Sequence, residues 1–404
     1  MREGWEMKKL GEVVSIERGG SPRPIEKYIT NSPDGINWIK ISDATASEKY
    51  IYETKEKITR DGLHKTRVVN EGDFILSNSM SFGRPYIMKT RGCIHDGWLV
   101  LKQKDNKIFE TEFLYYLLSS PFVFQQFNSK AAGSTVRNLN IALVSSVDVP
   151  TPPLPEQHRI VAILDEAFAA IAKAKANAEQ NLKNAKELFE SYLQGVFEQR
   201  GDGWEEKTLG EIAKHSLGKM LDKNKNKGTL QKYLRNQSVR WFSFNLNDLT
   251  EMPFLENEKE KYTAIKGDVM VCEGGYPGRA AIWEEDYPIY FQKAIHRVRF
   301  HKIEYNKLFL YYLFISDKSG KLKTHFSGTG IQHFTGEALH KFVVPVPPVN
   351  EAKSIVQKLD ALSAQTKKLE AIYQQKINDL EELKKSILQK AFSGELKTVE
   401  ALAL

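Results

Sequence analysis

Residues 156–197 read EQHRIVAILDEAFAAIAKAKANAEQNLKNAKELFESYLQGVF, a stretch that has no proline and only one glycine, Gly195. Its apolar residues recur every three or four positions, which is typical of a helix with one apolar stripe. The stripe consists of Ile160, Leu164, Ala167, Ile171, Ala174, Ala178, Leu182, Ala185, Phe189, Tyr192 and Val196. This spacing is close to that of a coiled coil, and it predicts one continuous helix roughly 60 Å long.

A second stretch of the same kind runs from Glu351 to Phe392. Its apolar residues are Ile355, Leu359, Leu362, Leu369, Tyr373, Leu380, Leu383, Ile387 and Ala391. A helix of this length cannot bury a one-sided stripe against itself, so each stripe needs a partner. We therefore expect the two helices to pair as an antiparallel coiled coil. Each helix should begin after a proline pair, Pro152-Pro153 or Pro347-Pro348, because proline does not fit inside a helix.

The segments that precede the two helices also repeat, in the same order. The matched blocks, 195 to 199 positions apart, are Gly4-Trp5-Glu6 with Gly203-Trp204-Glu205, Gly72-Asp73 with Gly267-Asp268, Gly83-Arg84 with Gly278-Arg279, Phe113–Leu117 with Phe309–Leu313, and Leu164-Asp165 with Leu359-Asp360. Between these blocks the two halves differ freely. The chain is therefore a duplication in which one framework carries two different surfaces. We expect Trp5 and Trp204 in the core, and Gly83 and Gly278 in turns.

The repeat predicts an α+β fold made of two mixed α/β domains in tandem, each followed by a long helix. Short apolar runs such as 73–76 and 97–101 are bounded by Gly, Asn, Ser and Pro, as strands are. The predicted segments are α/β domains at 1–153 and 201–348, a first long helix at 154–200, and a second long helix with a C-terminal tail at 349–404. The duplication predicts internal pseudo-two-fold symmetry.

Composition narrows the class of protein. The chain has 404 residues, a formal net charge of +7 and only two cysteines, Cys93 and Cys272. Two distant cysteines exclude a disulfide framework and fit reduced, partly buried thiols. The start has no signal-peptide pattern and no stretch of apolar residues is long enough to span a membrane, so we expect a cytoplasmic protein with no membrane contact. A positive excess of this size fits a polyanionic partner.

Two similar but non-identical domains on a basic chain favour a reader of double-stranded DNA with a split target. Base edges and phosphates are contacted by basic, amide, hydroxyl and aromatic side chains, which gather here in loops of both halves. On composition alone, the candidate DNA-binding residues are Arg18, Ser21, Arg23, Asn78, Ser79, Arg84, Ser134, Thr135, Arg137, Lys219, Lys223, Lys225, Glu273, Tyr276, Arg279 and Gln332. We expect no catalytic and no metal-binding residues.

These blocks resemble the specificity (S) subunits of type I restriction-modification systems. The resemblance covers essentially the whole chain and is strongest over Pro152–Asp165, PPLPEQHRIVAILD. The Gly-Trp-x-x-x-x-Leu-Gly-Glu starts at Gly4 and Gly203 also match, as do Gly133-Ser134-Thr135 and Gly328-Thr329-Gly330. The second copy departs from the pattern at Pro347–Lys353, so its helix start is expected to contact its neighbours differently.

The resemblance implies two target recognition domains, each reading one half of a bipartite site, with the helices as spacer and docking platform. It implies a non-catalytic subunit that assembles with two methyltransferase (M) subunits and with restriction-translocase (R) subunits. AdoMet, ATP and Mg²⁺ would act on those partners, and this chain would bind none of them. The bases contacted do not follow from the resemblance.

Three other functions compete with this interpretation. Phe326–Gly330 has the form of an AdoMet-binding loop, but the downstream Asn/Asp-Pro-Pro-aromatic motif of adenine methyltransferases is absent. Pro33-Asp34 with Glu53-Thr54-Lys55 has the form of a Mg²⁺ nuclease site, but the second half does not repeat it. A non-catalytic protein- or RNA-binding scaffold with a coiled-coil spacer fits the helices equally well, and a duplex-binding assay separates it from a DNA reader.

Overall fold

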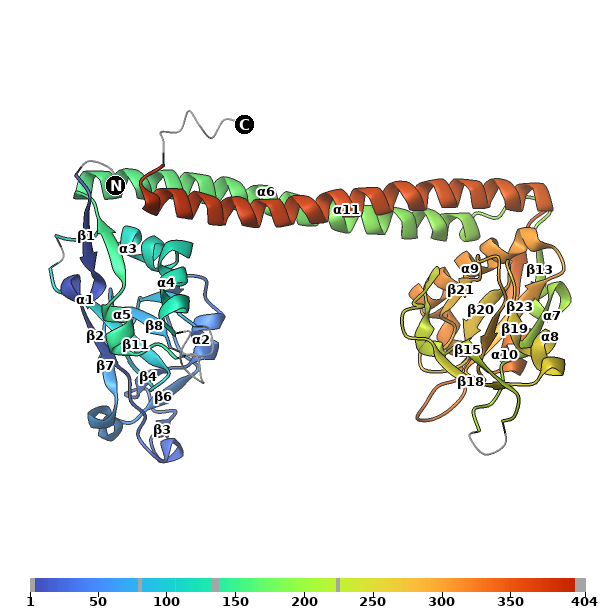
Figure 1. Ribbon diagram of the computed structural model, residues 1–404, viewed down its shortest axis with the longest axis horizontal. Helices are drawn as coiled ribbons and strands as arrows, with labels where there is room; N and C mark the ends of the chain where they lie inside the picture. The colour runs from blue at the N-terminus through green and yellow to red at the C-terminus, as the bar shows by residue number, and fades with distance from the viewer. Residues whose placement is uncertain (1–3, 79–81, 106, 132–137, 223–225, 397–404) are drawn as a thin grey trace. The chain divides into compact units, whose positions relative to one another are not determined.

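The computed structural model of the protein describes residues 4–78, 82–105, 107–131, 138–222 and 226–396. The chain forms two compact units, of which unit 1 comprises Met1–Glu179 with Gln375–Leu404 and unit 2 comprises Gln180–Gln374. Each unit contains one α/β domain and half of each long helix (Figure 1). The compact units therefore divide the helices, whereas the sequence-based segments treat each helix as separate from the domains.

The domain of unit 1 is built from short strands and short helices. Its strands are β1 (Glu6–Lys9), β2 (Val14–Arg18), β3 (Ile29–Thr30), β4 (Ile36–Ile39), β5 (Tyr50–Ile51), β6 (Glu56–Ile58), β7 (Arg67–Val69), β8 (Phe74–Ser77), β9 (Pro85–Met88), β10 (Gly92–Ile94), β11 (Trp98–Gln103) and β12 (Asp148–Thr151). Its helices are α1 (Leu10–Val13), η1 (Ile25–Lys27), α2 (Ile41–Thr45), η2 (Arg60–Lys65), α3 (Thr111–Leu118), α4 (Pro121–Ala131) and α5 (Ile141–Ser145). The sheets have the orders β2-β11-β8-β9-β5, β3-β6-β4-β10-β7 and β1-β12.

The domain of unit 2 repeats this plan with smaller sheets. Its strands are β13 (Glu205–Thr208), β14 (Ala213–Leu217), β15 (Thr229–Leu234), β16 (Val239–Arg240), β17 (Ser243–Phe244), β18 (Thr250–Phe254), β19 (Thr263–Ala264), β20 (Val269–Cys272), β21 (Ala280–Ile282), β22 (Ile289–Phe291), β23 (Ile295–Phe300) and β24 (Val343–Val346). Its helices are α7 (Leu209–Ile212), η3 (Asn236–Ser238), η4 (Glu256–Glu258), α8 (Lys259–Tyr262), η5 (Ile303–Tyr305), α9 (Asn306–Lys318), η6 (Lys321–His325) and α10 (Gly336–Lys341). The sheets have the orders β14-β23-β20-β21, β18-β15-β22-β19, β13-β24 and β16-β17.

The central strands are apolar on both faces, which explains the unbroken runs in the sequence. Side chains alternate across a strand, so Leu99 and Leu101 of β11 enter one core cluster while Trp98 and Val100 enter another. In unit 2, β20 does the same: Val269 and Val271 enter one cluster, and Met270 and Cys272 enter the next. The sheet that contains β11 and the sheet that contains β20 are therefore each packed between two apolar cores.

The two long helices are α6 (Leu154–Glu198) and α11 (Val349–Ser393). In unit 1, Lys175 donates to Glu381 at 2.8 Å, and Arg159 donates to the carbonyl of Leu396 at 3.4 Å. An earlier residue of α6 thus contacts a later residue near the end of α11, and a later residue of α6 contacts an earlier one. The two helices run in opposite directions, so the predicted antiparallel pairing is confirmed. Among the described residues, no helix is both long and apolar enough to cross a membrane.

Apolar contacts dock each domain on its share of the helices. The core of unit 1 joins Phe113 and Leu117 of α3 to Ile160 and Leu164 of α6, and to Phe392 of α11. A corresponding cluster in unit 2 joins α9 to the C-terminal half of α6 and the N-terminal half of α11; its buried members are Leu193, Phe197, Leu308, Tyr311, Phe314, Ile315, Ala352 and Leu359. Trp5 is buried and Trp204 packs against this second cluster, as expected for both.

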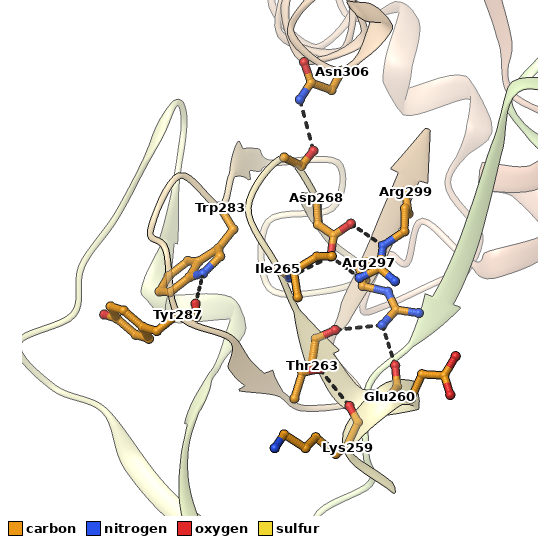
Figure 2. A network of polar contacts seen from close by, with 11 residues as sticks. Lys259, Glu260, Thr263, Ile265, Asp268, Trp283, Tyr287, Arg297, Arg299 and Asn306 are labelled. Carbon is orange, nitrogen blue, oxygen red and sulfur yellow. Dashed lines mark hydrogen bonds and ion pairs between the residues drawn. The ribbon is translucent and has the colours of Figure 1, made fainter. Parts of the chain in front are cut away.

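A polar network joins the strands of unit 2 near the start of β20 (Figure 2). Asp268 is only 2% exposed, and Arg299 of β23 contacts both of its oxygens, at 2.7 and 2.6 Å. Arg297 of the same strand donates to the carbonyls of Glu260 and Thr263, at 2.9 and 2.7 Å. A buried carboxylate needs a paired cation because desolvation alone would exclude its charge. The Asp268–Arg299 pair therefore anchors β23 in the middle of its sheet.

Candidate nucleic-acid interface

The same hydrogen-bond frame holds the polar loops at one end of the central strands in both units. The bonds of unit 1 are Gly19 N to Trp98 O (2.9 Å), Asn78 N to Gly97 O (3.0 Å), Leu139 N to Asn78 O (2.9 Å) and Gly83 N to Ser77 O (2.9 Å). Those of unit 2 are Gly218 N to Ile295 O (3.1 Å), Glu273 N to Ala294 O (2.9 Å), Phe334 N to Glu273 O (2.8 Å) and Gly278 N to Cys272 O (2.9 Å). We call two residues equivalent when they occupy the same place in this frame. Asn78 is thus equivalent to Glu273, and Asp96 to Lys293.

Glycine is required at the turn that follows β8 in unit 1 and β20 in unit 2. Gly83 and Gly278 have φ values of 74° and 83°, a region that residues with a Cβ rarely adopt. A Cβ would also lie 2.9 Å from the ring of Phe127 at Gly83, and 2.3 Å from Leu322 at Gly278. The turn is therefore fixed by backbone and packing, which confirms both predicted turn glycines. The next residue is an arginine in both units.

That next residue is Arg84 in unit 1 and Arg279 in unit 2. Arg84 is exposed, and its guanidinium lies 5.2 Å from the centre of the Tyr86 ring. Arg279 lies at the same 5.2 Å from the ring of Tyr276, although that tyrosine precedes it in the chain. A guanidinium held over an aromatic face keeps its charge and loses little freedom on meeting an anion. The two units therefore present the same cation from the same turn.

In unit 1, four of the sequence-predicted residues converge on Asp96. Its carbonyl accepts from Arg18 Nε at 3.1 Å and from Asn78 Nδ2 at 2.8 Å. Its carboxylate accepts from Ser21 Oγ at 2.7 Å, and Arg23 Nη2 lies 3.7 Å away. The Ser21 hydrogen bond holds the pKa of the Asp96 carboxyl below its ordinary value, so the group is charged at neutral pH. Asp96 thereby organises the loop that follows β2.

A hollow of about 1340 Å³ adjoins this cluster in unit 1. Its lining combines apolar side chains such as Ile29 with Trp38, His95, Lys40 and Arg23. Burial lowers the pKa of His95, so its ring is neutral at pH 7 and can accept or donate a hydrogen bond. The hollow therefore places exposed Arg23 beside apolar side chains and the neutral His95 ring, a combination suited to nucleic-acid bases and phosphates.

The equivalent place in unit 2 has a different charge pattern. Lys293 is exposed where unit 1 has Asp96, and half-buried Glu273 stands where unit 1 has Asn78. Burial raises the pKa of Glu273, while the charges of His333 and Lys293 act in the opposite direction. These residues line a hollow of about 510 Å³ together with exposed Met220 and Leu221. The two surfaces are therefore chemically distinct on one frame.

Two further predicted residues of unit 2 lie near this surface. Tyr276 is 44% exposed, and its hydroxyl donates to Asp317 at 3.0 Å. Gln332 is exposed in the segment between η6 and α10, where Ser327 and His333 exchange two backbone hydrogen bonds of 2.9 Å. Phe326–Gly330 follows the 3₁₀ helix η6 and not a strand, so it lacks the context of an AdoMet-binding loop. Among the described residues, no group of three or more His, Cys, Asp or Glu could hold a metal ion.

The family model for the type I restriction modification DNA specificity domain matches this chain twice, over residues 2–183 and 201–382. The chain belongs to this family. Each match contains one α/β domain, so the chain is a type I restriction-modification specificity subunit with two tandem target recognition domains. Subunits of this kind recognise DNA and do not catalyse the reaction, which confirms the prediction that the chain is not an enzyme.

Individual relatives match most of the chain. The chain is 22% identical to the MjaVIII specificity subunit of Methanocaldococcus jannaschii, a match that covers 98% of this chain and 93% of the relative. It is 24% identical to the EcoKI specificity subunit of Escherichia coli K12, over 72% of this chain and 67% of that one. Its fold resembles a chain solved in a study of assembly and conformational transition of the type I R-M system, with a TM-score of 0.79, 20% identity and coverage of 98% and 99%. The HsdS subunit from Thermoanaerobacter tengcongensis gives a TM-score of 0.61 at 20% identity, with 98% of each chain covered.

The first target recognition domain gathers Arg18, Ser21 and Arg23 at Asp96 and carries Arg84 on the separate turn after β8. The second carries Glu273, Tyr276, Arg279 and Gln332. Two other predicted residues do not lie on the surface. Asn78 is 2% exposed and Lys219 is 7% exposed. Lys219 donates to Glu258 at 2.5 Å and to the carbonyl of Pro253 at 2.8 Å, so its charge is used inside the domain. Predicted residues Ser79, Ser134, Thr135, Arg137, Lys223 and Lys225 lie outside the described residues.

The sequence-based selection missed Asp96, His95 and Lys293. All three lie within three residues before the equivalent strands β11 and β23. Aligning the two halves on those strands would have placed Asp96 opposite Lys293.

Proposed function

We propose that each target recognition domain of this specificity subunit reads one half of an asymmetric, bipartite DNA duplex. The support is that one frame carries different side chains at equivalent positions: Asn78 and Asp96 in the first domain, Glu273 and Lys293 in the second. Donors and acceptors on base edges select for complementary side chains, so two different sets would select two different sequences. The shared arginines, Arg84 and Arg279, would contact the phosphate backbone in both half-sites.

The chain would act as the recognition part of a larger enzyme. Its named relatives are specificity subunits of type I restriction enzymes, and by that kinship the chain would dock two M subunits and, for cleavage, R subunits. AdoMet, ATP and Mg²⁺ would be used on those partners, and this chain would bind none of them. The paired halves of α6 and α11 would then serve as spacer and docking platform for the assembly.

The length of the paired helices would fix the gap between the two half-sites. Inserting seven residues at Glu179 in α6 and at Gln375 in α11 preserves the coiled-coil phase and adds about 10 Å of helix. Methylome sequencing should then show both half-sites unchanged and the gap longer by about three base pairs. An unchanged gap would contradict this role of the helices.

Binding of duplex DNA by the assembled complex tests the proposal. The chain is co-purified with its M subunit and mixed with a library of duplexes that vary over two separated half-sites. One split sequence should be retained, with an affinity that falls steeply as salt rises, because lysine and arginine release counterions from phosphates. Equal retention of all duplexes would contradict sequence reading, and retention of RNA or protein alone would favour the scaffold alternative.

A further inference from the structure

Position 96 of the first domain and position 293 of the second are the same place in the frame and carry opposite charges. Each residue lies in the three-residue connection between the strands β10 and β11, or β22 and β23. The carbonyl of the next residue, Gly97 or Ala294, accepts the frame's hydrogen bond from Asn78 or Glu273. The backbone at both positions is therefore fixed, and the side chain is the part that differs.

In the first domain, the acid at this place pairs with an exposed cation. The side chain of Arg23 is 81% exposed, and in the described structure its ion-pair partner is Asp96, at 3.7 Å. Ser21 contacts the other carboxylate oxygen, which ties down the loop on which Arg23 is carried. An exposed arginine that is already oriented loses less conformational entropy when it meets a base.

In the second domain, the loop after β14 is held by other groups. Lys219 is tied to Glu258 and to the carbonyl of Pro253, and its backbone accepts from Lys293 N at 2.8 Å. The side chain of Lys293 is exposed beside Glu273 and His333. In the first domain the exposed cation is Arg23, which pairs with Asp96. In the second domain the residue equivalent to Asp96, Lys293, is itself the cation.

We propose that Asp96 and Lys293 determine the specificity of the two half-sites, Asp96 as a positioning residue that aims Arg23 at a guanine edge and Lys293 as a direct donor to a base. This inference rests on the proposed function. Arginine reads guanine through its O6 and N7 atoms with two hydrogen bonds from a rigid planar fork. Lysine can donate to the same acceptors, but its flexible ammonium group fixes the geometry less and discriminates less where an arginine fork is replaced. The first half-site should therefore contain a guanine that depends on Arg23, and the second a guanine that depends on Lys293.

The test uses the full chain assembled with its M subunit and a wild-type target defined by methylome sequencing. The variants are Asp96→Asn, Arg23→Lys, Lys293→Met and the double variant Arg23→Lys/Asp96→Asn. Exposed Asp34→Asn and Lys302→Met, which change the same charges elsewhere on each domain, are the controls. Binding is measured by competition among duplexes that carry each of the four base pairs at each half-site position.

Asp96→Asn and Arg23→Lys should each reduce discrimination at the same base pair of the first half-site by about tenfold. The double variant should lose no more than Arg23→Lys alone, because Asp96 acts through Arg23. Lys293→Met should relax one base pair of the second half-site only. Melting temperatures and the preferences at all other positions should match those of the controls.

A uniform loss of affinity over all duplexes, or a change in both half-sites from one variant, would overturn the inference. So would an Asp96→Asn complex with unaltered base preference, provided that the wild-type complex prefers a split sequence. A wild-type complex without that preference would overturn the proposed function, and this inference with it.

Discussion

The hydroxyl of Tyr311 on α9 donates a hydrogen bond of 2.7 Å to the carboxylate of Asp360 on α11. Tyr116 on α3 donates in the same way to Asp165 on α6, at the equivalent place of the other unit. Burial and the neighbouring carboxylate raise the pKa of both tyrosines, so both remain protonated donors at neutral pH. Each recognition domain thus makes a tyrosine–carboxylate hydrogen bond to its helix inside an apolar contact.

Removing this bond should loosen the second domain from its helix. Tyr311→Phe leaves the carboxylate of Asp360 with Lys307, at 2.9 Å, but without its buried donor. We expect a loss of about 2 kcal/mol in the free energy of unfolding, measured with urea, because the acceptor is charged. The matched control is Tyr192→Phe, whose ring is 42% exposed. An equal loss in both variants would show that the bond has no specific role.

Arg299 should be far more important for stability than its counterpart in the first domain. Arg299→Met leaves the 2%-exposed carboxylate of Asp268 without its cation, which should cost about 3 kcal/mol. In the first domain the corresponding pair, Lys102 and Asp73, is separated by 3.7 Å and is partly exposed. Lys102→Met should therefore cost less than about 1 kcal/mol in the same urea titration. Equal costs would contradict the view that the second pair anchors its sheet.

Stability of the second domain should fall in mild acid because of His296. This ring is 1% exposed and bonded to the carbonyl of Phe334, and burial lowers its pKa from an ordinary value of 6.5 to about 4. A depressed pKa means that the folded state prefers the neutral ring, so its stabilisation is complete above pH 6.5 and is lost as the pH falls toward 4.

His296→Gln keeps an amide that can reach the same carbonyl but does not titrate. Urea unfolding at pH 7.5 and pH 5 should show a smaller difference between the two conditions for this variant than for the wild type. His64→Gln, at an exposed position of the first domain, should behave like the wild type. Identical pH dependence in all three proteins would contradict the assignment.

The paired arginines should act on DNA without regard to sequence. Arg84→Ala and Arg279→Ala each remove a cation from the same turn of the frame, so each should weaken binding of all duplexes by a similar factor. The slope of log affinity against log salt should fall by about one for each variant, as for a lost phosphate contact. A change of base preference would instead assign these arginines to base reading.

The long helices could be predicted from the sequence because their signal is local. The stripe that contains Ile160 and Leu164 is periodic, and the Pro152-Pro153 pair marks where it begins, one residue from the observed start at Leu154. The second sheet of each domain could not be predicted in the same way. Its strands are two to six residues long, and β4 pairs in parallel with β10, a partner more than fifty residues away.

The candidate interface was predicted only in part, for a related reason. A polar residue in a glycine-rich loop looks available until its partners are known, and those partners are distant in the chain. Asn78 is used by Leu139 and Asp96, and Lys219 by Glu258, all through long-range contacts. Arg84 and Arg279 could be selected as a pair because their turn is repeated together with its glycine. Arg84 is exposed, whereas Arg279 is half-buried and donates to the carbonyl of Asn236 at 3.0 Å.

The central claim is that the two domains read DNA independently. Replacing residues 1–153 by a second copy of residues 201–348, in the full chain assembled with its M subunit, puts the same reading surface at both places. Methylome sequencing of cells that express this complex should reveal a target in which the second half-site occurs twice and the first is absent. Retention of the first half-site, or a target unrelated to either half, would contradict the account.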